Sequence, residues 1–163
     1  MKLQADYGFY ISLMIFITAI VFIFYEIVSF YPLFYRELKK EVLYFEGYQI
    51  SQILVNDPGE PADWYSDLSE IERIGLASEF FNTFNLLSIQ KVNAVNFLCN
   101  NEYERFKKLI GTNYDVNLVL ILLDGRYLIN CTKNLSREIA VKVSRIIALD
   151  DQKSYGELII WVY

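Results

Sequence analysis

The sequence predicts an α+β fold in which a long N-terminal helix packs on a small antiparallel sheet of about four strands, with two or three short helices between them. Two observations predict it. Apolar residues follow a helical pattern as far as Val55, with no cluster of turn residues after Tyr25. From Tyr114 onward the pattern changes to that of β-strands. A helix and a sheet that each have an apolar side bury it by packing together.

The first part of the helix is apolar on every side. Residues Tyr7–Tyr25 (YGFYISLMIFITAIVFIFY) contain no charge, and Asp6 and Glu26 close the stretch. At about 1.5 Å per residue this helix is roughly 28 Å long, close to the hydrocarbon thickness of a bilayer. Aromatic residues lie at both ends, where membrane interfaces favour them. We therefore expect a membrane-inserted helix, with the lipid bilayer as a partner.

The second part of the helix, residues 26–55, is amphipathic. Leu38, Val42 and Phe45 are apolar, and charged residues stand between them. Pro32 lacks an amide hydrogen, so we expect a kink there. An anchor joined to a separate soluble helix is the alternative, but the lack of a turn cluster favours one continuous helix.

Residues 56–67 (NDPGEPADWYSD) form the one obvious linker, because two prolines and a glycine interrupt regular structure. The chain then divides into a leader and transmembrane helix (1–25), an amphipathic continuation (26–55) and a head domain (56–163). The linker contains four acids, which raise the alternative of a calcium site: Asp57, Glu60, Asp63 and Asp67. Their spacing differs from that of a calcium-binding loop, so we interpret the segment as a solvated acidic loop and expect no metal.

The head contains candidates for three short helices. Ser69-Glu70-Ile71-Glu72 has the pattern of a capping box, in which Ser69 caps the helix and Glu72 reaches back. Ser88–Leu98 is a longer helical pattern. Glu102–Ile110 follows it, with Asn101 as the expected cap and Gly111 as the stop.

Four strands are expected in the C-terminal part of the chain. Val116–Leu123 is almost entirely apolar, and Arg126–Cys131 returns from it across an Asp124-Gly125 turn, a strong hairpin signal. Apolar residues alternate from residue 139 to about 149, and Glu157–Val162 is the last strand. Short connections between consecutive strands predict an antiparallel sheet.

Composition excludes several classes of function. The net charge of −5 argues against a nucleic-acid partner, since phosphate binding needs a basic surface. The chain has no histidine, which removes the usual zinc and copper ligand sets and the Cys–His and Ser–His catalytic pairs. The candidate catalytic carboxylates have no spacing that selects them: Asp63, Asp115, Asp150 and Asp151. The last two indicate a solvated turn. We expect neither enzymatic activity nor a cofactor.

The chain has two cysteines, Cys99 and Cys131. They are compatible with one disulfide, which would contribute roughly 3–4 kcal/mol in the chain-entropy model, and equally with two separate buried thiols. Two glycosylation sequons lie nearby, at Asn130 and Asn134. Sequons and a disulfide favour a head outside the cell.

The distribution of basic residues indicates the opposite orientation. Only Lys2 precedes the apolar stretch, whereas Arg36, Lys39 and Lys40 follow it. Under the positive-inside rule this difference places the C-terminal domain in the cytoplasm. On these observations alone, the orientation stays open.

Several different short segments follow one another in a characteristic order along most of the chain. A minimal basic leader (Lys2) runs directly into the apolar helix. The further segments are, in order, Gly59-Glu60-Pro61-Ala62-Asp63-Trp64, Ile74-Gly75-Leu76-Ala77, Leu87-Ser88 with Lys91, Leu109-Ile110-Gly111 before Tyr114-Asp115-Val116, and a closing Trp161 strand after Arg145. In these segments the chain resembles archaeal type IV pilin-like proteins with a class III signal peptide. The resemblance implies a head outside the cell membrane and, after assembly, an extracellular filament of helices packed together.

The resemblance also implies residues for processing and assembly. A prepilin peptidase would cleave between Leu3 and Gln4, although pilin leaders usually have a small residue before the bond. Pilins commonly carry Glu at the fifth mature position, which here is Gly8, so Asp6 is the candidate assembly carboxylate. The alternative is that Asp6 marks the end of the membrane span.

Two hypotheses follow. The first is a major or minor pilin-like subunit of an archaeal surface filament, which adheres through its head and assembles with its own copies or with other pilin subunits. Small residues on the apolar helix (Gly8, Ser12 and Ala19) allow close approach of a neighbouring helix. The second is a single-pass protein with an external binding domain that never polymerises.

Overall fold

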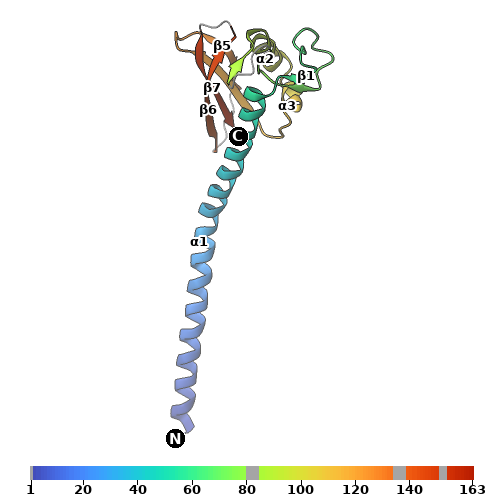
Figure 1. Ribbon diagram of the computed structural model, residues 1–163. Helices are drawn as coiled ribbons and strands as arrows, with labels where there is room; N and C mark the ends of the chain where they lie inside the picture. The colour runs from blue at the N-terminus through green and yellow to red at the C-terminus, as the bar shows by residue number, and fades with distance from the viewer. Residues whose placement is uncertain (1, 80–84, 134–138, 151–153) are drawn as a thin grey trace. The chain divides into compact units, whose positions relative to one another are not determined.

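The computed structural model describes residues 2–79, 85–133, 139–150 and 154–163, and the side chains of residues 2–6 lie outside this description. The chain forms two compact units, Met1–Lys39 and Lys40–Tyr163. Its elements follow one another in the order α1, β1, β2, β3, α2, α3, β4, β5, β6 and β7 (Figure 1). The fold is therefore α+β, as predicted.

Helix α1 spans Lys2–Asn56 and continues through Pro32. The prediction of one uninterrupted helix is therefore confirmed. The boundary between the two units falls inside this helix, between Lys39 and Lys40. The last part of α1 thus belongs to the head unit, whereas the sequence-based division began the head at residue 56.

One side of this last part of α1 is buried. The buried residues recur every three or four positions: Leu43, Gly47, Ile50, Ser51 and Leu54. Helix and sheet approach closely at Gly47, because a Cβ atom added there would lie 3.0 Å from Val143 Cγ2 and 3.1 Å from Val162 Cγ2. Because Gly47 has no side chain, the helix can lie directly on strands β6 (Val141–Leu149) and β7 (Tyr155–Val162).

The centre of the head is a five-stranded mixed sheet with the strand order β3-β6-β7-β4-β5. Its members are β3 (Leu86–Leu87), β4 (Val116–Leu122), β5 (Tyr127–Cys131), β6 (Val141–Leu149) and β7 (Tyr155–Val162). The last four are the predicted strands, and they pair antiparallel. The short strand β3, which the sequence analysis did not predict, pairs parallel with β6. Strands β1 (Gly59–Glu60) and β2 (Arg73–Ile74) form a separate antiparallel pair.

The hairpin between β4 and β5 has the predicted turn. Gly125 has a φ of +87°, a conformation that glycine adopts without steric cost. Its amide donates to the carbonyl of Leu122, and the backbone amide of Arg126 donates to the carboxylate of Asp124. The Asp-Gly pair therefore closes the turn as the sequence indicates.

Two short helices follow strand β3: α2 (Ile89–Asn101) and α3 (Tyr103–Leu109). The expected cap of the second helix was wrong. Asn101 is the last residue of α2, and its side-chain amide donates to the carbonyl of Phe97. Gly111, in contrast, follows α3 with a φ of +74°, as expected for a helix stop.

The capping box at Ser69 was also wrong, because no helix begins there. The hydroxyl and the amide of Ser69 both donate to the carboxylate of Asp67. The amide of Glu72 donates to the carbonyl of Glu60, which joins β1 to the segment before β2. A local side-chain turn and a long-range backbone pair therefore replace the helix.

Asp150 has a role that the sequence analysis missed. Its carboxylate accepts a hydrogen bond of 3.1 Å from the amide of Ile89, the first residue of α2. Ser88, the residue before the helix, makes no side-chain cap. The acid therefore satisfies a free amide at the start of α2 from 61 positions away in the sequence, instead of merely solvating a turn. Asp151 lies outside the described residues.

Candidate functional site: the apolar surface of helix α1

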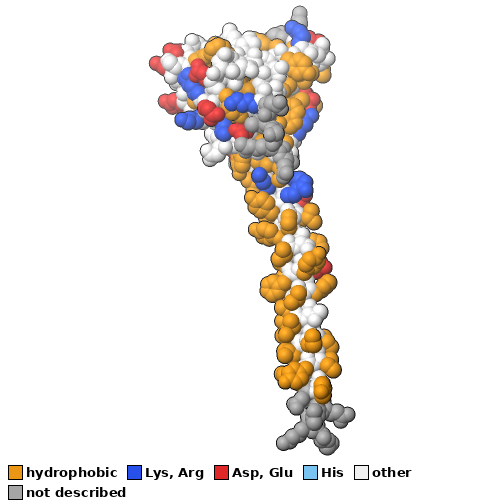
Figure 2. All heavy atoms as spheres, turned by 180° about the vertical axis from the view of Figure 1, so that it is seen from behind, with side chains coloured by type: hydrophobic (Ala, Val, Ile, Leu, Met, Phe, Trp, Pro, Cys, Tyr) orange, Lys and Arg blue, Asp and Glu red, His pale blue; other side chains and the backbone are white. Residues whose placement is uncertain are grey.

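The most extensive candidate site is the surface of α1 within the unit Met1–Lys39. The large apolar side chains that this surface exposes by half or more include Tyr7, Phe16, Phe22, Phe24, Val28, Phe30, Tyr31 and Phe34. Hydrophobic side chains follow one another along the helix in Figure 2. Among the described residues, α1 is the one helix long and apolar enough to span a membrane.

The exposed apolar surface does not end where the predicted span ends. After Glu26 the chain continues with exposed Ile27, Val28, Phe30, Tyr31, Leu33, Phe34 and Tyr35, and the next charge is Arg36. Residues 7–35 therefore form an apolar surface that is about 43 Å long, at about 1.5 Å per residue. The hydrocarbon layer of a bilayer is about 30 Å thick. The hydrocarbon layer alone therefore leaves about 13 Å of this surface uncovered.

Two hydroxyl groups of this helix are satisfied within it. The hydroxyl of Ser12 donates to the carbonyl of Gly8 at 3.0 Å, and the hydroxyl of Thr18 donates to that of Met14 at 2.8 Å. These internal hydrogen bonds let a hydroxyl enter an apolar environment without an unsatisfied donor.

Small residues leave room on the helix surface for a neighbour. A Cβ atom added to Gly8 would meet nothing within 4 Å. A shallow hollow is lined by Met14, Ile15, Thr18, Ala19 and Phe22. Side chains at these spacings form the type of hole into which a side chain of a second helix packs.

The predicted processing and assembly residues lie at the start of α1. The backbone of Leu3, Gln4 and Asp6 is helical, and their side chains lie outside the described part of the chain. Cleavage between Leu3 and Gln4 and the partner of Asp6 therefore stay predictions.

Within the head unit, α1 has a second exposed apolar side. Val42, Tyr44, Phe45 and Tyr48 are 42–61% exposed. The guanidinium carbon of Arg145 lies 4.7 Å from the centre of the Tyr48 ring, and the Arg145 Nε donates to the hydroxyl of Ser51 at 3.1 Å. The hydrogen bond from Arg145 lowers the pKa of the Tyr48 hydroxyl. Arg145 thus ties strand β6 to α1 beside this surface.

The segment after α1 is held by a network around the carbonyl of Pro58. Trp64 is fully buried, and its indole nitrogen donates to Pro58 and to the carbonyl of Gly75 at 3.2 and 3.1 Å. Lys91, which is 1% exposed, donates from Nζ to Pro58 and Ala77 at 2.8 and 3.1 Å. Its ammonium also lies 2.9 Å from a carboxylate oxygen of Glu79. Short segments that are far apart in the sequence therefore meet at the end of α1.

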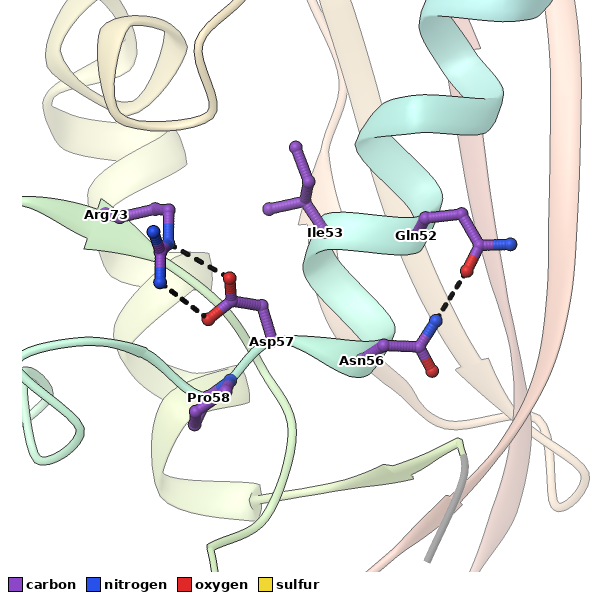
Figure 3. A pocket seen from close by; sticks show the side chains of 6 residues that line it. All are labelled: Gln52, Ile53, Asn56, Asp57, Pro58 and Arg73. Carbon is purple, nitrogen blue, oxygen red and sulfur yellow. Dashed lines mark hydrogen bonds and ion pairs between the residues drawn. The ribbon is translucent and has the colours of Figure 1, made fainter.

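Two of the four linker acids, Asp57 and Glu60, pair with the same cation, Arg73. Asp57 faces Arg73, with its Oδ2 3.0 Å from Nε, and Figure 3 shows this pair beside a hollow at the end of α1. Gln52, Ile53, Asn56 and Pro58 complete the lining. Asp67 accepts from Ser69, and these hydrogen bonds lower the pKa of its carboxyl. No group of acids suited to a metal ion occurs among the described residues.

Cys99 and Cys131 form a disulfide, one of the two alternatives that the sequence left open, with Cα atoms 5.8 Å apart. The bond joins α2 to β5, the edge strand of the sheet. Next to it, the amide of Asn130 donates to the side-chain oxygen of Asn96 on α2 at 3.1 Å. Helix α2 thus holds this edge strand through a covalent bond and satisfies one of its backbone amides.

Of the two predicted glycosylation sites, Asn130 and Asn134, the first lies among the described residues. Asn130 is exposed on β5, in register with Val119 of β4. Asn134 lies outside the described residues. Glycan attachment stays a prediction for both.

Comparisons of the chain with protein-family models, with curated proteins and with solved structures found no match.

Proposed function

We propose that this protein is a membrane-anchored, non-enzymatic, pilin-like subunit that assembles into a surface filament through helix α1. One observation carries the proposal: the exposed apolar surface of residues 7–35 is about 43 Å long and exceeds the hydrocarbon layer of a bilayer, which is about 30 Å thick. Apolar surface that lipid does not cover is stabilised when another protein surface covers it. Parallel copies of the same helix offer a matching apolar surface.

The proposed orientation has the head outside the cell. The Cys99–Cys131 disulfide supports it, because disulfides persist in oxidising compartments. The exposed sequon at Asn130 supports it as well. Mass spectrometry of the membrane protein tests the orientation, with loss of the glycan mass expected in N130Q and in the sequon control T132A. Labelling of head lysines only from the cytoplasmic side would overturn it.

The proposed maturation is cleavage between Leu3 and Gln4 by a prepilin peptidase. Mass spectrometry of the mature N-terminus tests it directly. We expect Gln4 as the first residue of protein recovered from filaments. An intact Met1-Lys2-Leu3 sequence in that material would count against pilin-type processing.

Electron microscopy and immunoblotting of material sheared from cells test assembly. We expect the protein in sheared filaments, as the main component or a minor one.

The second candidate function is a single-pass protein with an external binding domain that does not polymerise. The exposed apolar side of α1 beside the head argues against it, because a monomer would leave this side in water. Protein confined to the membrane fraction as a monomer would favour this second candidate.

A further inference from the structure

Glu26 is a single carboxylate within the apolar surface of α1. It lies between Tyr7–Tyr25 and the apolar residues 27–35, and it is half-buried. Its neighbours one helical turn away are Phe22, Ile23, Ser29 and Phe30, and none is a cation. An ionised carboxylate in an apolar environment is costly unless it is paired. Glu26 therefore needs a partner once this surface is covered.

The chain does not supply that partner from within the same helix. In the described part of the molecule, Glu26 makes no ion pair, and neither does Arg36. Arg36 is the nearest cation in the sequence, ten positions after Glu26. At about 1.5 Å per residue the two lie about 15 Å apart along the helix axis, which is too far for a direct pair.

We propose that Glu26 forms an ion pair with Arg36 of a neighbouring copy of this chain, and that this pair sets the axial offset between parallel helices. The proposal rests on the assembly proposed above and specifies its register. Copies in one membrane share their orientation, so a shift of ten residues, about 15 Å, brings Arg36 of one copy beside Glu26 of the next.

Arg36 is the better partner for two physical reasons. Lys39 would need an offset of about 20 Å, which would leave less of the two apolar surfaces in contact. A guanidinium also binds a carboxylate through two parallel hydrogen bonds and is less strongly hydrated than an ammonium, so it is better suited to a dry interface. Lys40 already has an interaction within its own chain.

Carbodiimide cross-linking of full-length protein in isolated filaments or membranes tests the contact. The reagent joins a carboxylate and an amine as an amide, and takes up the released water to become a urea. In R36K we expect a cross-linked peptide pair in which Glu26 of one copy is joined to the lysine amine at position 36 of another. The double variant E26Q/R36K should lack this cross-link. In the wild-type protein we expect no link from Glu26 to Lys39 or Lys40, and such a link would overturn the assignment.

Charge exchange tests the energetic role of the pair. We expect E26R and R36E each to lower the yield of sheared filaments about ten-fold or more. An unpaired desolvated charge costs more free energy than a ten-fold change in the assembly equilibrium constant requires. The double variant E26R/R36E should restore the yield. E26Q separates loss of the pair from failed membrane insertion, and E41Q is a matched control outside the apolar surface. If E26Q or R36E forms filaments at the wild-type yield, the ion pair is overturned and the proposed assembly is not. If the wild-type protein never assembles, both the ion pair and the proposed function are overturned.

Discussion

Trp64 and Lys91, which are 27 positions apart in the sequence, donate hydrogen bonds to the same acceptor, the carbonyl oxygen of Pro58. Both side chains are buried, and each has a further carbonyl partner in the segment 75–77. The same segment pairs with the end of α1, because the amide of Leu76 donates to the carbonyl of Leu54 at 2.8 Å. This network joins the last turns of α1 to the rest of the head unit.

We expect K91M to destabilise the head by about 3 kcal/mol, because the carbonyls of Pro58 and Ala77 both lose a buried, charged hydrogen-bond donor. Urea unfolding of the full chain in detergent, followed by tryptophan fluorescence, measures the change. The control K108M replaces an exposed lysine of α3 and should change the free energy of unfolding by less than about 0.5 kcal/mol. Equal effects of the two substitutions would contradict a special role for Lys91.

We expect G75A to destabilise the head by about 2–4 kcal/mol, the range for forced overpacking and backbone displacement. A Cβ atom at position 75 would overlap backbone atoms of Asp57 and Gly59, which cannot rotate away as a side chain does. Thermal unfolding by circular dichroism measures the effect. The matched control is G8A, since a Cβ at Gly8 meets nothing within 4 Å, and it should leave the unfolding of the head unchanged.

Loss of the disulfide should lower the free energy of unfolding by roughly 3–4 kcal/mol in the chain-entropy model. C99S removes the bond between α2 and β5, and C99S/C131S should have nearly the same stability, because one bond is lost in both. Non-reducing gels and thiol titration establish the oxidised state. Free thiols in the wild-type protein, with the same mobility as C99S, would contradict the bond.

Tyr103 should make unfolding depend on pH in the alkaline range. Burial raises the pKa of its hydroxyl above the ordinary value of about 10, and this hydroxyl donates to the carbonyl of Val116 and accepts from its amide. Because the pKa is raised in the folded state, this contribution to stability is complete below pH of about 10 and is lost as the pH rises toward the folded pKa.

Ultraviolet titration of tyrosinate tests this expectation. The wild-type protein should contain a tyrosine that ionises late, and Y103F should lack it. Y103F should also cost about 2 kcal/mol at neutral pH, because two buried backbone groups lose their partner. Y155F, at an exposed tyrosine, is the control and should change neither measurement. An unchanged titration curve in Y103F would contradict the raised pKa.

The regular elements were predictable where a local pattern decides them. The apolar run of α1, the Asp124-Gly125 turn and the four strands β4–β7 each follow from residues close together in the sequence. The errors occur where a distant partner decides. Ser69 has the pattern of a helix cap, but its hydroxyl donates to the carboxylate of Asp67. The amide of Glu72 donates to the carbonyl of Glu60. Strand β3 exists because β6 offers an edge with which to pair.

The candidate site shows the same division. Periodicity and charge indicate the apolar helix, and the structure adds that its exposed apolar surface continues past Glu26 to Tyr35. The cysteine count left a disulfide and two buried thiols equally open. Only the approach of α2 to β5 decides between them, because a bond requires Cα atoms at a distance such as the 5.8 Å observed.

The sequence by itself thus determined the class of the fold, the long apolar helix and the positions of strands β4–β7 along the chain, because periodicity and turn chemistry act over a few residues. The tertiary structure alone decided that Pro58 joins Trp64 to Lys91, that Asp150 caps α2, and that α1 lies directly on the sheet at Gly47. These contacts join residues far apart in the chain. Their formation depends on the packing of whole elements, which no local pattern encodes.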